Sequence, residues 1–181
     1  MQTTATPTPT PSDTPARPHT GRARVLEGPV GLVLSLVLVA AVAVVGGTAT
    51  ATGSDSWYRT IEKPPWNPPD GVFGPVWSVL YVLMAVAAWL VARRGLHRRD
   101  VKVALGAYLV QLALNLAWSL VFFGMESPGG GLVLIAALLV ALGVTILRFR
   151  PLSRAAALLL VPYLAWVAFA ATLNAGVLIL N

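Results

Sequence analysis

The side chains that could do chemistry in this sequence are indoles, phenols and uncharged amides, and they recur at helical spacing inside apolar segments. Steps of three or four residues place side chains on one face of a helix. The three sets are Trp77 and Tyr81, then Gln111, Asn115, Trp118 and Ser119, and finally Pro162, Trp166, Ala170 and Asn174. Because amides and hydroxyls facing lipid would lack hydrogen-bond partners, we expect the three faces to meet inside a helix bundle. They predict a pocket that stacks on aromatic rings.

Two other interpretations of these residue types stay open. Asparagine and glutamine in membrane helices often bond only to a neighbouring helix and stabilise packing. Tryptophan is often an anchor at the membrane surface. This interpretation suits Trp57, near the outer surface, and Trp89, near the inner end of the second apolar segment. Trp77, Trp118 and Trp166 lie deeper, beside polar residues, which favours a pocket.

Acids, bases and metal ligands are missing from the apolar segments. All seven acidic residues and both histidines fall outside them, and the chain has no cysteine. Proton-coupled transport normally uses carboxylates or histidines within the membrane, and haem iron needs an axial ligand such as histidine. We therefore expect neither a proton pump nor a histidine-ligated haem carrier, and we expect no metal site and no required cofactor.

Composition identifies the elements that must position these residues. Hydrophobic residues make up 56% of the chain and charged residues 11%, whereas a soluble domain has about 25% charged residues. Five apolar spans, at about 29–50, 73–92, 103–123, 129–147 and 155–180, are each close to the roughly 20 residues that a helix needs to cross a bilayer. The sequence predicts an all-α integral membrane protein, with a five-helix transmembrane bundle over residues 28–181.

Residues 1–27 differ from the rest in composition. Repeated Thr-Pro and few apolar side chains predict a disordered tail. The end of the first span, Ala49-Thr50-Ala51, resembles a signal-peptidase site, so processing there is an alternative. The apolar run is long for a signal peptide, and we expect the helix to be retained.

The basic residues predict the orientation in the membrane. Three lie in the tail, five between the second and third spans, and three between the fourth and fifth, which leaves only Arg59 and Lys63 on the other side. The positive-inside rule then places the amino terminus in the cytoplasm and residues 51–72 and the carboxyl terminus outside, in a bacterial cell membrane. The formal charge of +6 is explained by topology and lipid contact, so we expect no nucleic-acid partner.

The segment between the first two spans predicts a stiff aromatic loop. Four prolines between positions 64 and 69 fix φ and exclude a regular helix. The loop carries Trp57 and Trp66, and it carries two cations, Arg59 and Lys63, that could meet the carboxylates of a ligand at the pocket mouth. The alternative for the two cations is that they are only solvated loop charges.

Four stretches in this order, WYRTIEKPPWNPP, FGPVWSVLY, LNLAWSLVFF and PYLAWVAFAATLN, resemble the tryptophan-rich sensory protein or translocator protein (TspO/MBR) family, which is related to the peripheral benzodiazepine receptor. The resemblance covers residues 28–181. It implies a five-helix bundle, a homodimer, and ligands such as porphyrins, sterols and benzodiazepine-type compounds. Animal members carry a Tyr and an Arg near the end of the last helix where this chain has Ala175 and Ile179, so sterol binding there is not implied.

The residues and the resemblance together predict a membrane receptor or sensor that binds porphyrins or other flat hydrophobic molecules and regulates tetrapyrrole metabolism or a stress response. The alternatives are slow photo-oxidative breakdown of bound porphyrin, with Trp77 and Trp166 as candidate redox groups, and transport of porphyrin or lipid-like ligands. Whether the protein is an enzyme is left open. The predicted ligand-binding residues are Trp57, Arg59, Lys63, Trp66, Trp77, Tyr81, Gln111, Asn115, Trp118, Trp166, Ala170 and Asn174.

Overall fold

The computed structural model describes residues 28–49 and 57–181. The predicted disordered tail therefore lies outside the described residues, as do Thr50 and Ala51 of the predicted processing site.

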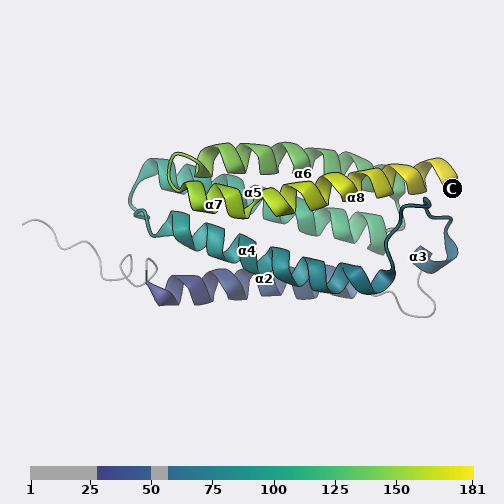
Figure 1. Ribbon diagram of the computed structural model, residues 1–181, viewed down its shortest axis with the longest axis horizontal. Helices are drawn as coiled ribbons and strands as arrows, with labels where there is room; N and C mark the ends of the chain where they lie inside the picture. Colours follow the sequence, from purple (N-terminus) through teal and green to yellow (C-terminus); the bar gives the residue numbers. More distant parts are fainter. Residues whose placement is uncertain (1–27, 50–56) are drawn as a thin grey trace, which may run out of the picture.

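Five helices that are long and apolar enough to cross a membrane lie side by side in the described part of the chain (Figure 1). They are α2 (Pro29–Ala49), α4 (Phe73–Ala92), α5 (Arg99–Ser119), α6 (Pro128–Phe149) and α8 (Val161–Leu180), the last preceded by the short α7 (Arg154–Leu159). No strand occurs among the described residues. The predicted all-α five-helix bundle is confirmed.

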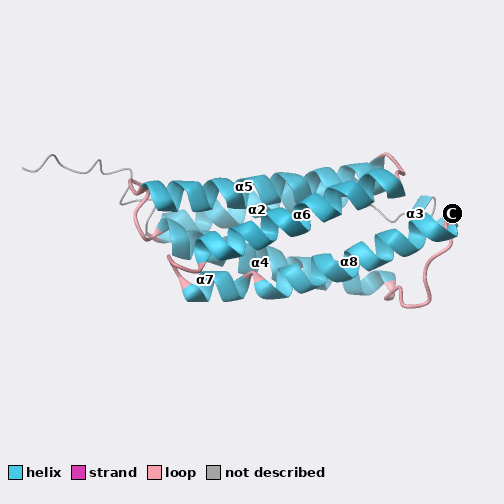
Figure 2. Ribbon diagram, turned by 90° about the horizontal axis from the view of Figure 1, so that it is seen from above, coloured by secondary structure: helices cyan, strands magenta, loops and turns pink. Residues whose placement is uncertain are grey.

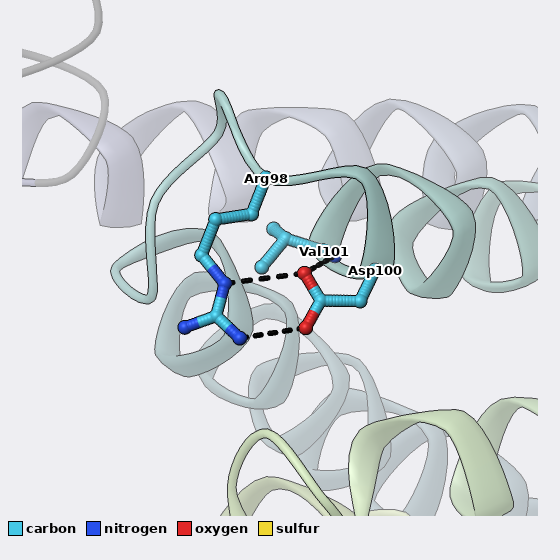
Figure 3. Close-up of polar contacts among 3 residues, drawn as sticks. All are labelled: Arg98, Asp100 and Val101. Carbon is cyan, nitrogen blue, oxygen red and sulfur yellow. Dashed lines mark hydrogen bonds and ion pairs between the residues drawn. The ribbon is translucent and has the colours of Figure 1, made fainter.

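The third predicted span begins earlier than the sequence suggested, because a polar pair starts its helix. The Asp100 carboxylate accepts a hydrogen bond from the Val101 backbone N–H at 2.9 Å, and it pairs with the Arg98 guanidinium through contacts of 3.1 and 2.6 Å (Figure 3). An acidic group in the first turn is favourable beside the positive end of the helix dipole. The helix α5 thus starts at Arg99, four residues before the predicted boundary at 103.

At its other end α5 widens into a π-helical turn, η2 (Leu120–Gly124), where the Met125 N–H donates to the Leu120 carbonyl. Such turns insert one extra residue and often lie beside functional sites. This turn directs Phe122 and Phe123 toward the loop that follows α2: both rings contact Tyr58, with centroid distances of 6.2 and 5.3 Å.

The fifth predicted span consists of two helices rather than one (Figure 2). Ser153 caps α7 by accepting a hydrogen bond from the Ala156 N–H at 3.2 Å. Pro162 lies in the first turn of α8, where its missing N–H and its ring prevent α7 from continuing without a break. The predicted span over 155–180 therefore corresponds to one candidate membrane span, Arg154–Leu180, with a break at Leu160 that the sequence analysis did not indicate.

The core runs along the interface of α4, α5, α6 and α8. Met84, Leu138, Leu142 and Tyr163 are completely buried in it. By contrast, α2 packs mainly on α4 at the edge of the bundle, and its outward residues, such as Val37 and Val44, are exposed (Figure 1). These exposed apolar side chains form the surface that lipid would cover.

The described basic residues gather at the two ends unequally. Those between residues 93 and 102 and between residues 148 and 154 lie at the end where α4 stops and α5 begins, whereas Arg59 and Lys63 lie at the opposite end, near α3 (Trp57–Thr60) and the carboxyl terminus (Figure 1). The placement of these ends in a cell membrane stays a prediction.

Candidate functional site

A cavity of about 530 Å³ lies inside the bundle at the end that carries α3. Side chains or backbone from α2, α4, α5 and α8, together with the loop between α2 and α4, form its walls. The lining residues are Ala43, Gly46, Gly47, Tyr58, Asp70, Gly71, Phe73, Gly74, Trp77, Ser78, Tyr81, Asn115, Trp118, Ser119, Phe123, Trp166 and Ala170. Six of the twelve predicted site residues are among them: Trp77, Tyr81, Asn115, Trp118, Trp166 and Ala170.

Aromatic rings dominate the walls contributed by α4 and α8. The rings of Trp77 and Tyr81, one turn apart on α4, have centroids 5.4 Å apart. Phe73, at the start of α4, contacts Trp166 of α8 edge to face at 5.9 Å. Contacts of this geometry are favourable beyond the area that they bury. They fix a set of aromatic faces and edges around one space.

The faces of α4 and α5 are joined by a hydrogen bond inside the bundle. The Tyr81 hydroxyl donates to the Asn115 Oδ1 at 3.1 Å. A polar contact of this kind satisfies groups that would otherwise lie in an apolar environment. Both residues line the cavity, and the Asn115 Nδ2, which makes no hydrogen bond of good geometry, faces the Tyr163 hydroxyl of α8.

Asn174 supports the cavity from behind and does not line it. Its Oδ1 accepts a hydrogen bond from the Trp118 Nε1 at 3.2 Å, while its Nδ2 donates to the Pro128 carbonyl at 2.7 Å. Gly131 makes room for this bridge, because a Cβ there would lie 2.8 Å from the Asn174 Oδ1. The carboxamide therefore orients the Trp118 indole against the starts of α6 and η2.

The wall from α2 was missed by sequence reasoning. It consists of Ala43, Gly46 and Gly47, which have no polar or aromatic side chain to mark them. The Gly46 carbonyl accepts a hydrogen bond from the Ser119 hydroxyl at 3.1 Å, which ties α2 to α5. Two adjacent glycines in an apolar helix are the signal that could have indicated this close approach.

Tyr58 was also missed, although it lies at the mouth. Its hydroxyl donates to the Asn67 Oδ1 at 2.9 Å, and the Lys63 ammonium lies 4.5 Å from the centroid of its ring. Burial, and to a smaller degree the negative charge of Asp70, raises the pKa of Tyr58 to about 12. Tyr58 is therefore a neutral hydrogen-bond donor at physiological pH.

The other predicted loop residues lie outside the cavity lining. Trp57 packs edge to face on Phe122 at 5.9 Å, Trp66 is 53% exposed, and Arg59 is exposed. Lys63 stacks on Tyr58, as described above. The charged side chain that does line the mouth is acidic, namely Asp70, and sequence reasoning did not single it out.

The loop is held in place by the end of α8. Pro64 rests on Gly176, where an added Cβ would lie 2.9 Å from the Pro64 Cγ. Beyond it, the Asn181 side chain accepts from the Glu62 N–H at 3.1 Å and donates to the Glu62 carbonyl at 3.0 Å. These contacts fix the loop over the α3 end of the bundle.

Two further predicted residues lie elsewhere. Gln111 is completely buried, one turn from Asn115 on the same face of α5, and is not part of the lining. Trp89, which we interpreted as an anchor, lies at the opposite end of α4, where its Nε1 donates to the Gly28 carbonyl at 2.9 Å and its ring contacts the Arg93 guanidinium at 4.6 Å.

The described residues contain no group of three or more metal-ligating side chains.

Comparison with known proteins gives the same family as the motifs. The model of the TspO/MBR family matches residues 35–180. The chain is 45% identical to the tryptophan-rich protein TspO of Chlorobaculum tepidum over 150 residues, which cover 83% of this chain and 95% of the relative. It is 36% identical to the tryptophan-rich sensory protein of Cereibacter sphaeroides over 148 residues, covering 82% and 91%. It is also 44% identical to the human translocator protein over 119 residues, covering 65% and 70%. On its motifs, its five-helix bundle and these matches, the chain belongs to the TspO/MBR family of membrane sensory and translocator proteins.

Proposed function

We propose that this protein is a membrane receptor that binds a porphyrin or a similar flat aromatic molecule in the cavity between α2, α4, α5 and α8. The observation that carries the proposal is the exposure of Trp77, Trp118 and Trp166, from three different helices, to one cavity of about 530 Å³. This volume is within the roughly 300–1,000 Å³ of small-molecule sites. Indole faces and edges are suited to stacking on the rings of such a ligand.

The mouth determines how an anionic ligand would enter. Asp70 lines the cavity and repels carboxylates, whereas the Lys63 ammonium lies 4.5 Å from the ring centroid of Tyr58, another lining residue, and Arg59 is exposed on the loop. Porphyrin carboxylates would therefore extend past Asp70 toward the loop cations, while the ring enters between the indoles. A charge left inside the apolar bundle without a partner would be strongly unfavourable.

Fluorescence titration in detergent or nanodiscs tests the proposal. Protoporphyrin should quench tryptophan fluorescence saturably, with about one site per chain. Trp77→Phe should reduce the quenched amplitude, whereas Trp89→Phe, at the far end of α4, should leave the affinity unchanged. Quenching that does not saturate, or that both variants alter equally, would indicate partition into lipid or detergent in place of a site.

A relative named as a sensory protein supports a regulatory output, in which the bound state reports tetrapyrrole level or stress. Transport is the competing function. Porphyrin flux into protein-containing liposomes, measured against empty liposomes, separates the two: a receptor binds ligand without raising the flux.

A second candidate activity, light-driven breakdown of bound porphyrin, is favoured by the position of two indoles on the same cavity. Trp77 and Trp166 both line it, so either could give one electron to the photoexcited ring, with dioxygen as the terminal oxidant. Phenylalanine keeps a stacking face but is much harder to oxidise. Trp77→Phe combined with Trp166→Phe should abolish light-driven porphyrin loss and weaken binding by only about 1–3 kcal/mol. Unchanged loss in the double variant excludes the two residues as electron donors.

A further inference from the structure

Buried polar atoms continue from the cavity into the bundle. Among the described residues, the Tyr108 hydroxyl, both amide atoms of Gln111, the Asn115 Nδ2 and the Tyr163 hydroxyl are buried and make no hydrogen bond of good geometry, and the last two face each other between α5 and α8. Gln111 and Tyr163 are completely buried, and Tyr108 and Asn115 are 2% and 3% exposed. We call these four residues the polar floor.

The polar floor is one connected group. Tyr108, Gln111 and Asn115 follow one face of α5 over about 10 Å, and Asn115 lines the cavity. The ring of Tyr163 lies 6.0 Å from that of Trp77, which contacts Tyr81, the donor to Asn115. The Tyr163 hydroxyl of α8 faces the Asn115 amide of α5.

Packing alone does not account for these atoms. Native proteins pair most buried polar groups, and each exception calls for a water molecule, a ligand or a functional reason. Thr145 of α6 shows the ordinary solution in this bundle, because its buried hydroxyl donates to the Ala141 carbonyl of its own helix at 2.8 Å. The amide of Gln111 has no such bond, and apolar residues of similar size would pack there without an unsatisfied group.

The polar floor contains only uncharged polar groups. It offers amide and hydroxyl donors together with amide and hydroxyl acceptors. The described lysines and arginines all lie near the ends of the bundle, before residue 64, between 93 and 102, or between 148 and 154. An ionised carboxylate would find no opposite charge here, whereas a carbonyl, hydroxyl or amide would find both donors and acceptors.

We propose that the polar floor is a binding subsite, continuous with the cavity, that receives a neutral hydrogen-bonding group at the inner edge of an aromatic ligand. This inference rests on the proposed function, because it concerns the ligand that the cavity holds. A buried water with two to four polar partners would satisfy these groups in the free protein. The ligand group displaces this water and reproduces its hydrogen bonds. Ligands are then selected by a neutral hydrogen-bonding group at their inner edge.

Three anthracenes of one ring size test the subsite: the 9-carboxamide, the 9-methyl hydrocarbon and the 9-carboxylate. Affinities are measured in nanodiscs for the unaltered protein and for Gln111→Met, Tyr163→Phe and the control Thr145→Val. Gln111→Met and Tyr163→Phe should each weaken the carboxamide about tenfold, the effect of a lost buried hydrogen bond. Neither should change the affinity of the hydrocarbon, which also reports that the cavity is intact. Thr145→Val should change neither affinity, and the unaltered protein should bind the carboxamide more tightly than the carboxylate.

The outcomes separate the two proposals. If none of the three anthracenes binds the unaltered protein, the proposed function fails. If they bind but Gln111→Met and Tyr163→Phe affect the carboxamide and the hydrocarbon equally, or affect neither, the cavity stands and the subsite is wrong. Preference of the unaltered protein for the carboxylate would also overturn the subsite.

Discussion

Asp70 brings a negative charge to the cavity mouth, where the loop cations were predicted to meet a ligand. It lines the cavity, and Lys63 lies nearby over the ring of Tyr58, which also lines the cavity. A carboxylate at the mouth opposes an anionic ligand and slightly favours a neutral or cationic one. Solvent and salt screen the effect of charges at this open end of the cavity.

Removing this charge should strengthen binding of an anionic porphyrin. Two charges about 4 Å apart in a watery environment interact with about 1 kcal/mol, so Asp70→Asn should tighten protoporphyrin binding about two- to fivefold at low salt. Asp70→Glu, which keeps the charge, is the matched control and should leave the affinity unchanged. Titration with the uncharged dimethyl ester should show no effect of either variant. Weaker binding of protoporphyrin to Asp70→Asn would show that the carboxylate accepts a hydrogen bond from the ligand.

At the scale of elements, the loop and α8 act as one unit. Pro64 fits against Gly176, and Asn181 bonds to the backbone of Glu62. The loop is therefore fastened to the helix that supplies Trp166 and Ala170 to the cavity. Its position depends on the absence of a side chain at one position of α8.

We predict that Gly176→Ala lifts the loop. The new Cβ would lie 2.9 Å from the Pro64 Cγ, and the proline ring is too rigid to yield. Such overpacking costs about 1–3 kcal/mol of stability, and a displaced loop should let porphyrin dissociate faster. Gly143→Ala is the matched control, because nothing lies within 4 Å of its new Cβ. Thermal unfolding measures the loss of stability, and stopped-flow mixing measures the rate of porphyrin dissociation. Equal dissociation rates for Gly176→Ala and Gly143→Ala would mean that the loop does not restrain the ligand.

For the whole molecule, the distribution of basic residues predicts the orientation in the membrane. In the described part, most basic residues gather at the end opposite to α3 (Figure 1), which the positive-inside rule places in the cytoplasm. A reporter that is active only in the cytoplasm should work when fused before Arg17 or inserted near Arg98, and fail after Asn181. Reporter activity at the carboxyl terminus would contradict this orientation.

The homodimer implied by the family resemblance also stays a prediction, which light scattering in detergent would test.

The sequence predicted most of the bundle because five long apolar runs have few alternatives in a membrane. It also indicated the faces of α4, α5 and α8, because Trp77, Asn115 and Trp166 are conspicuous in an apolar helix. It could not indicate the wall from α2, which is made of glycine and alanine. Nor could it place Asn174 behind Trp118. Its spacing of four residues from Ala170 puts it on the cavity-facing side of α8, but spacing alone does not show whether the carboxamide lines the cavity or supports a residue that does.

The central claim, that the cavity itself is the binding site, is tested most directly by filling it. Ala170 lines the cavity and is 7% exposed, whereas Ala168, on the same helix, is exposed on the outer surface. We compare Ala170→Phe with Ala168→Phe, which add the same side-chain volume inside the cavity and on the outer surface of the bundle. Both variants are checked for helicity and thermal stability and then titrated with porphyrin. We predict that Ala170→Phe weakens porphyrin binding at least tenfold and that Ala168→Phe leaves it unchanged. Equal affinity of the folded Ala170→Phe variant and the unaltered protein would contradict the account.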